Sequence, residues 1–111
     1  MARRILKNIE ASQALALPEL VAYQKGQIVS RTLAQNAHVS LTLFAFDADE
    51  EISTHASGGD ALVQVLDGAV RITISGQDFE VAAGASIVMP AGEPHALRAP
   101  VPAKFLLTVV F

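Results

Sequence analysis

Histidines are the residues of this chain best suited to metal binding or proton transfer, because its 111 residues include three histidines and no cysteine. His95 stands directly after Pro90–Pro94, where proline and glycine predict a tight turn. A rigid turn fixes the direction of an imidazole at the start of the next strand. Imidazole ligates divalent metals and exchanges protons near neutral pH. His95 is therefore a candidate site residue, although the same residue types also occur in surface turns that have no chemistry.

His55 is the second candidate, and His38 is the third histidine. His55 ends a short predicted strand, and a glycine-containing loop, Ser57–Asp60, follows it. His38 opens another predicted strand, where a histidine needs no special role. Whether any of these imidazoles meet depends on how the strands between them are arranged.

Runs of β-branched and apolar residues separated by turn residues predict strands through most of the chain. The predicted strands cover Ile28–Gln35, His38–Phe46, Ile52–His55, Ala61–Leu66, Ala69–Ser75, Phe79–Val81, Ser86–Met89, Leu97–Ala99 and Phe105–Phe111. Short strands at this spacing, with little helical periodicity, indicate an all-β sandwich or barrel. Residues 1–27 are less regular. They predict an N-terminal arm or strand with a short helical turn, ahead of a barrel at residues 28–111, within one domain.

Composition limits the classes of partner. Hydrophobic residues make up 51% of the chain and charged residues 17%, which is apolar for a small domain and predicts a homodimer at least. The formal charge of −3 argues against a nucleic-acid partner. The apolar runs are too short to span a membrane, and no signal peptide is expected. The absence of cysteine fits a reducing compartment, so we expect a cytoplasmic protein.

The stretch Gly84–His95 resembles the second motif of the cupin superfamily, with Gly84, Pro90, Gly92 and His95 at matching spacing. Ala99 stands where that motif ends in asparagine. The resemblance covers roughly residues 38–111. It implies a cupin jelly-roll barrel that commonly forms dimers.

The first cupin motif is matched only in part. Aligned backwards from Gly68, the first histidine of that motif falls on His55, whereas Ser57 and Ala61 stand in place of its second histidine and its glutamate. The resemblance therefore implies an incomplete ligand set for a divalent metal, zinc, nickel, iron or manganese, with His55 and His95 as ligands.

A third donor is needed to hold such a metal firmly. Asp60, Gln64 and His38 are the candidates. Side chains alternate along a strand, so Asp60 and Gln64 should face away from the side of Ala61 unless the glycines before Asp60 allow a bulge.

Two functions stay open. One is a metal-dependent cupin enzyme of the dioxygenase or isomerase type, and the other is a metal-free domain that binds or senses a small molecule. Both need a small-molecule pocket inside the barrel. Phe44, Ser57 and Met89 are its candidate wall residues, although Phe44 and Met89 would also suit the core.

Overall fold

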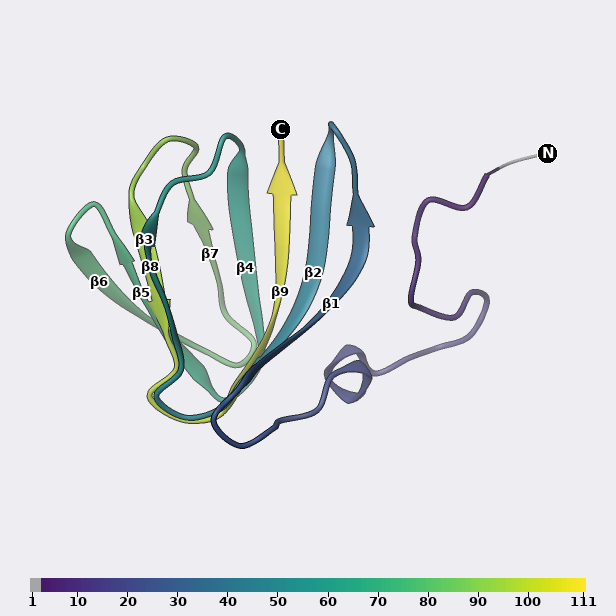
Figure 1. Cartoon of the computed structure of the whole chain (residues 1–111), viewed down its shortest axis with the longest axis horizontal. Helices are drawn as coiled ribbons and strands as arrows, with labels where there is room; N and C mark the ends of the chain where they lie inside the picture. The colour runs from purple at the N-terminus through teal and green to yellow at the C-terminus, as the bar shows by residue number, and fades with distance from the viewer. Residues whose placement is uncertain (1–2) are drawn as a thin grey trace.

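Nine antiparallel β-strands form two sheets in a computed structural model that describes residues 3–111 (Figure 1). The strands are β1 (Ile28–Gln35), β2 (Val39–Phe46), β3 (Glu51–His55), β4 (Asp60–Asp67), β5 (Ala69–Ile74), β6 (Gln77–Ala82), β7 (Ser86–Met89), β8 (His95–Arg98) and β9 (Ala103–Val110). The described residues contain no α-helix. Residues 3–27 contain a single 3₁₀ turn, η1 (Leu17–Leu20), in which Pro18 occupies the first turn.

The sheets face each other as the two halves of a barrel. One has the strand order β1-β2-β9-β4-β7 and the other β3-β8-β5-β6. Strands that are far apart in the sequence therefore become neighbours, and β8 lies between β3 and β5. The prediction of an all-β jelly-roll fold is confirmed. The strand predicted at Leu97–Ala99 begins two residues earlier, so His95 is itself the first residue of β8.

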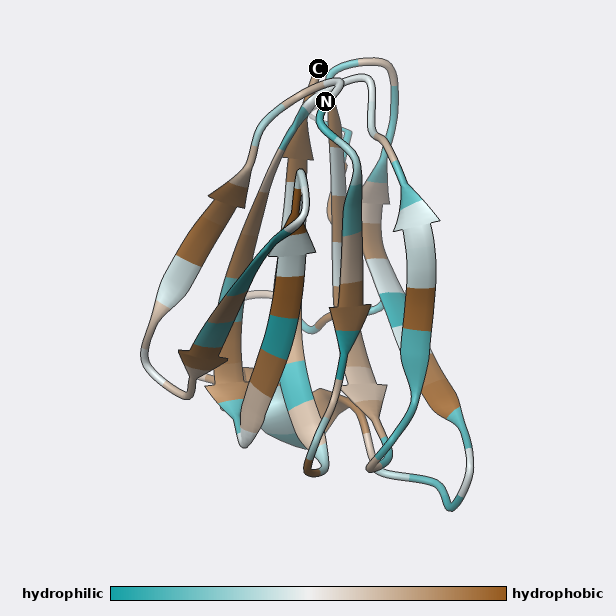
Figure 2. Ribbon diagram, turned by 90° about the vertical axis from the view of Figure 1, so that its left-hand side faces the viewer, coloured by the Kyte–Doolittle hydropathy of each residue, from teal (hydrophilic) through white to brown (hydrophobic). Residues whose placement is uncertain are grey.

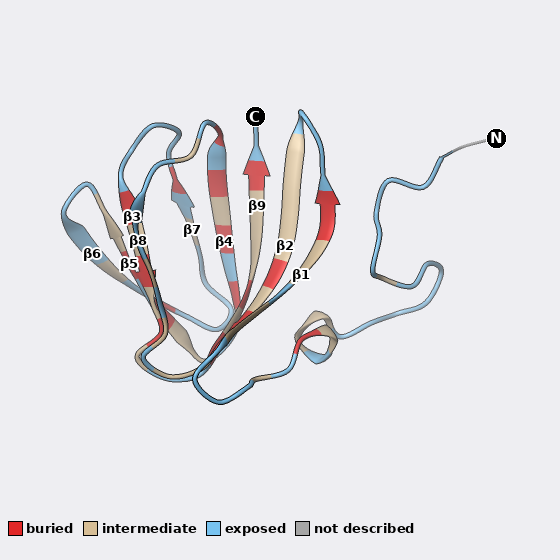
Figure 3. Ribbon diagram, in the orientation of Figure 1, coloured by how far each residue is buried: buried red, intermediate tan, exposed pale blue. Residues whose placement is uncertain are grey.

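Alternation along the strands builds the core between the sheets. On β4 every second residue is buried, and its neighbours on the outer face are exposed or half-buried. Figure 2 shows the same alternation as apolar and polar bands along the ribbons, and Figure 3 shows buried residues gathered on the strands. The largest fully buried side chains are Phe46, Phe105, Leu43, Ile72, Met89, Val63 and Val70.

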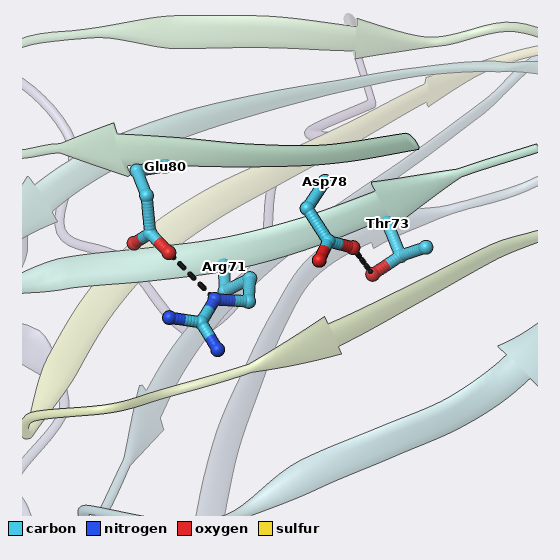
Figure 4. A network of polar contacts seen from close by, with 4 residues as sticks. All are labelled: Arg71, Thr73, Asp78 and Glu80. Atoms are coloured by element: carbon cyan, nitrogen blue, oxygen red, sulfur yellow. Dashed lines mark hydrogen bonds and ion pairs between the residues drawn. The ribbon is translucent and has the colours of Figure 1, made fainter. Parts of the chain in front are cut away.

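The two outer faces differ in polarity. On the four-stranded sheet, cross-strand partners on β5 and β6 pair by charge and hydrogen bond: Arg71 Nε lies 2.5 Å from Glu80 Oε1, and Thr73 Oγ1 donates to Asp78 Oδ1 at 2.6 Å (Figure 4). On the five-stranded sheet, Leu33, Leu43 and Ala45 form a second apolar cluster, which Val21 from the N-terminal arm completes. The outer face of the four-stranded sheet is therefore polar at these pairs, whereas that of the five-stranded sheet is apolar where the N-terminal arm covers it.

Gly68 and Gly76 give a matched test of this packing. Both have positive φ, +71° and +82°, but a Cβ on Gly68 would lie 2.0 Å from the Pro102 carbonyl oxygen, whereas one on Gly76 would meet nothing within 4 Å. We expect Gly76→Ala to cost about 1–2 kcal/mol of unfolding free energy through backbone strain alone. Gly68→Ala should cost about 2–4 kcal/mol, because the clash adds to the strain. Urea unfolding measures both, and equal losses would contradict the close approach of Gly68 to Pro102.

Candidate functional site

A network of backbone hydrogen bonds positions His95. The Glu93 N–H donates to the Pro90 carbonyl at 3.2 Å and closes the turn, and the Ser75 N–H donates to the Pro94 carbonyl at 2.9 Å. The Gly92 N–H donates to the Ser57 carbonyl at 2.9 Å, which ties this turn to the β3–β4 loop. The predicted turn is thus fixed at several points before the chain enters β8.

A one-residue bulge in β3 places His55 opposite His95. Ile52 pairs with Leu97, and the next pair along the two strands joins His55 to His95. A regular register would instead put Thr54 opposite His95. It would also turn the His55 side chain to the outer face, because side chains alternate along a strand. The extra residue between Ile52 and His55 returns His55 to the inner side.

The two imidazoles meet through their Nε2 atoms, which lie 3.1 Å apart. Each Nδ1 faces a backbone carbonyl: that of Ser53 lies 2.9 Å from His55, and that of Glu93 lies 3.2 Å from His95. Because a carbonyl oxygen only accepts, we assign the proton of each neutral ring to Nδ1. The lone pairs of both Nε2 atoms then converge, and the pair can share a proton, a ligand hydrogen or a cation.

The two rings differ in exposure. His95 is only 2% exposed, whereas His55 is exposed at the edge of the barrel. Burial lowers the pKa of His95 below its usual value, and the positive charge of a protonated His55 lowers it further. The hydrogen bond to the Glu93 carbonyl opposes these effects in part. His95 is therefore held toward its neutral form.

A cavity of about 250 Å³ opens beside the two imidazoles, inside the barrel. Phe44, Ser57 and Met89, the wall residues expected from the sequence, all line it. The full lining is Phe44, Ile52, His55, Ala56, Ser57, Ala61, Met89, His95, Leu97, Phe105, Leu107 and Val109. Only the two histidines and Ser57 are polar. The cavity is thus an apolar chamber with one polar end.

None of the three candidate third donors lines this cavity. The Asp60 carboxylate instead accepts the Ala91 N–H at 2.9 Å, which braces the turn before His95. Gln64 is exposed on the outer face of β4, as the alternation predicted. His38 lies at the β1–β2 turn, where its N–H donates to Asn36 Oδ1 at 2.8 Å. Within residues 3–111, no group of three or more His, Asp or Glu side chains is placed to hold a metal ion.

The Nε2 atoms of His55 and His95 are placed to occupy two coordination positions of one divalent metal ion. Two imidazole nitrogens bound at about 2.0–2.1 Å to one tetrahedral or octahedral ion would lie roughly 2.9–3.4 Å apart. The observed separation of 3.1 Å is compatible with this. Catalytic zinc sites usually have three protein ligands, whereas among the described residues only His55 and His95 are in place.

Comparison with known proteins identifies the family. The cupin domain family matches residues 42–111, which is more than half of the chain. The chain belongs to the cupin family. Comparison with curated proteins found no match.

Solved structures of two similar proteins cover nearly the whole cupin. A conserved protein of unknown function from Streptococcus pyogenes is 43% identical over 99% of this chain and 96% of its own, with a TM-score of 0.96. A cupin superfamily protein from Desulfitobacterium hafniense is 30% identical over 99% of both chains, with a TM-score of 0.91.

More distant similarity shows the fold alone. A variant of salicylate 1,2-dioxygenase from Pseudoaminobacter salicylatoxidans is 17% identical over 75% of this chain and 25% of its own, with a TM-score of 0.69.

In the described part of the cupin, no helix is both long and apolar enough to span a membrane.

Sequence reasoning missed several wall residues of this cupin. Phe105, Leu107 and Val109 line the cavity from alternate positions on β9, and Leu97 follows His95 at the same spacing on β8. The period of two was the available signal. It was obscured because two of the intervening residues of β9, Leu106 and Val110, are also apolar.

The lowered pKa of His95 predicts a pH-dependent loss of stability. Well above pH 6.5 the histidine is neutral in both states and contributes no pH dependence. As the pH falls from about 6.5 toward the lower folded-state pKa, the unfolded chain takes up a proton that the folded chain does not, so stability decreases. Thermal unfolding between pH 5 and 8 should therefore show a steeper decline for the wild type than for His95→Gln. Equal slopes would contradict this assignment.

The hydrogen bond between Asp60 and the Ala91 N–H predicts a second difference. Asp60→Ala should lower the free energy of unfolding by about 1 kcal/mol, because it removes the acceptor. Asp60→Asn retains a carbonyl acceptor of the same length and should recover most of the loss. Urea unfolding compares the two variants, and equal destabilisation would mean that the hydrogen bond contributes nothing.

Proposed function

We propose that this cupin binds a small, largely apolar molecule in the barrel cavity and recognises one polar group of that molecule through His55 and His95. The observation that carries this proposal is the convergence of the two Nε2 atoms, 3.1 Å apart, at the single polar end of an apolar chamber. An engineered protein cavity of about 150 Å³ accommodates benzene. A cavity of about 250 Å³ therefore has room for a substituted ring or a short branched chain.

The polar end offers complementary hydrogen-bonding groups. The two Nε2 atoms accept hydrogen from a hydroxyl or acid group of the ligand. The Ser57 hydroxyl oxygen already accepts the Gly59 N–H at 3.2 Å, so its own proton is available for donation. The apolar walls exclude water and strengthen these few polar contacts. A ligand with an apolar body and one hydroxyl or protonated carboxyl group matches this arrangement.

The same convergence favours a second candidate, a divalent ion held by His55 and His95 with water or ligand atoms at its other positions. Zinc, nickel, iron or manganese would supply Lewis-acid chemistry there. The fold likeness to a dioxygenase adds nothing to this candidate, because one barrel supports many reactions. In both cases the work of the chain is to orient the bound molecule at the imidazoles and to exclude water around it.

Benzoate, phenol and toluene provide the test. Benzoate is ionised at neutral pH and can only accept, so it should bind only when the imidazole pair carries a proton. We expect phenol to shift the NMR methyl signals of Met89 and Leu107 and to bind at least about tenfold more tightly than toluene, because the hydrogen bond that its hydroxyl donates is worth about 1.4 kcal/mol or more. His55→Ala should reduce that preference. Ala61→Phe should abolish binding by filling the cavity, whereas Ala82→Phe, the same change at an exposed position, should not.

The outcome that would overturn the proposal is a set of methyl signals that no probe shifts, or binding that survives Ala61→Phe. Titration with the four metals, with and without the probes, separates the candidates. Stoichiometric metal binding that is lost in both His55→Ala and His95→Gln would favour the second candidate. Probe binding that is unchanged by metal or by a chelator would favour the first.

A further inference from the structure

The turn between β5 and β6 holds a serine in a backbone conformation that serine seldom adopts. Ser75 has a φ of +48° and Gly76 a φ of +82°, so both residues of this two-residue turn are left-handed. Such turns suit the twist of a β-hairpin, and glycine, asparagine or aspartate is preferred at their first position. A serine there is strained. Because glycine would relieve the strain, the serine side chain is expected to contribute something that glycine cannot.

Ser75 contacts the turn that precedes His95 in two ways. Its N–H donates to the Pro94 carbonyl at 2.9 Å, and its hydroxyl donates to Glu93 Oε2. Ile74, the residue before it, is the cross-strand partner of His95. Figure 1 shows the β5–β6 turn and the β7–β8 turn at the same end of the barrel, the upper one in that view. Glycine would retain the backbone bond, so the hydroxyl is what serine adds.

Glu93 connects this contact to the imidazole. Its N–H donates to the Pro90 carbonyl at 3.2 Å, its carboxylate accepts the Ser75 hydroxyl, and its carbonyl oxygen lies 3.2 Å from His95 Nδ1. Glu93 also precedes Pro94, and a residue before proline is restricted to extended backbone conformations. Its backbone and its side chain are therefore both held, and its carbonyl is presented to His95 in a fixed direction.

The direction of that carbonyl determines which nitrogen of His95 carries the proton. A carbonyl oxygen only accepts, so it favours the imidazole with the proton on Nδ1. In water, a neutral histidine side chain prefers the proton on Nε2 instead. With its proton on Nε2, His95 would donate to a bound molecule at the polar end of the cavity rather than accept from it. The tautomer of a buried ring thus depends on a hydrogen bond between two exposed residues.

We propose that Ser75 is a positioning residue of the candidate site. Through Glu93 it fixes His95 as the tautomer whose Nε2 accepts hydrogen at the cavity. Ser75 does not line the cavity, so it acts on a bound molecule only through these two residues. This role rests on the proposed function for the use that a ligand makes of Nε2, whereas the tautomer is a property of the protein without ligand.

Nitrogen NMR of the His95 ring at pH 8, where the imidazole is neutral, tests the proposal. In the wild type the proton should lie on Nδ1. Ser75→Gly and Glu93→Ala each remove the bond between the two side chains, so each should raise the ratio of the Nε2–H to the Nδ1–H tautomer about threefold or more. Glu93→Gln keeps an acceptor for the Ser75 hydroxyl and should restore the wild-type ratio. The double variant Ser75→Gly/Glu93→Ala should change the ratio no further than either single variant.

Asp49→Gly is the matched control. Asp49 also has a positive φ, +70°, and its side chain accepts one hydrogen bond, from Arg98 Nη2 at 2.8 Å. It stands just before the start of β3, whereas His55 is the last residue of that strand. The substitution should leave the His95 tautomer unchanged. Both glycine variants should keep a cooperative thermal transition with a midpoint within about 4 °C of the wild type, because relief of strain offsets the lost contact.

Binding of phenol and toluene relates the tautomer to the proposed function. Ser75→Gly should reduce the preference for phenol about threefold or more, and Asp49→Gly should retain it. A wild-type His95 with its proton on Nε2 would overturn the proposal, as would a tautomer ratio that Ser75→Gly leaves unchanged or that Asp49→Gly changes equally. If neither probe binds the wild type, the proposed function fails, and the tautomer ratios alone decide the role of Ser75.

Discussion

The candidate site depends on one irregularity in strand pairing, the extra residue between Ile52 and His55 in β3. The pleat otherwise sends alternate side chains to opposite faces of the sheet. Without the bulge, the imidazole of His55 would lie outside the barrel and Thr54 would face His95. Adding one residue changes the local chemistry from a lone buried histidine to two imidazoles whose Nε2 atoms lie 3.1 Å apart.

The rest of the local structure keeps this pair in place. The backbone carbonyls of Ser53 and Glu93 set the orientation of the two rings, and the bond from the Gly92 N–H to the Ser57 carbonyl joins the two segments that bear them. Burial then acts on His95 alone, because His55 remains exposed. The two rings have the same chemistry but different solvation, so one is held toward neutrality at the cavity while the other lies open to water.

Local sequence predicted the strands and the turn before His95 because both follow from short-range patterns: alternation along Ala69–Ile74, and proline and glycine in Pro90–Pro94. It also indicated that Asp60 and Gln64 would face outward. It did not predict the bulge, because β3 takes its register from β8. The two strands are far apart in the sequence: His55 pairs with His95, forty residues later. The role of Asp60 as a brace for the Ala91 N–H was missed for the same reason, since that contact is long-range.

Strand β9 shows why an apolar run was hard to interpret. Phe105, Leu107 and Val109 face the cavity, while Leu106 and Val110 face outward to the arm-covered cluster and to solvent. A strand with solvent on one side would alternate with polar residues. Lys104 and Thr108 supply that alternation on the outer face of β9, but Leu106 and Val110 interrupt it, so both faces of the strand carry some apolar side chains. The cavity accounts for the inner ones, and the cluster formed with the N-terminal arm accounts for Leu106 on the outer face.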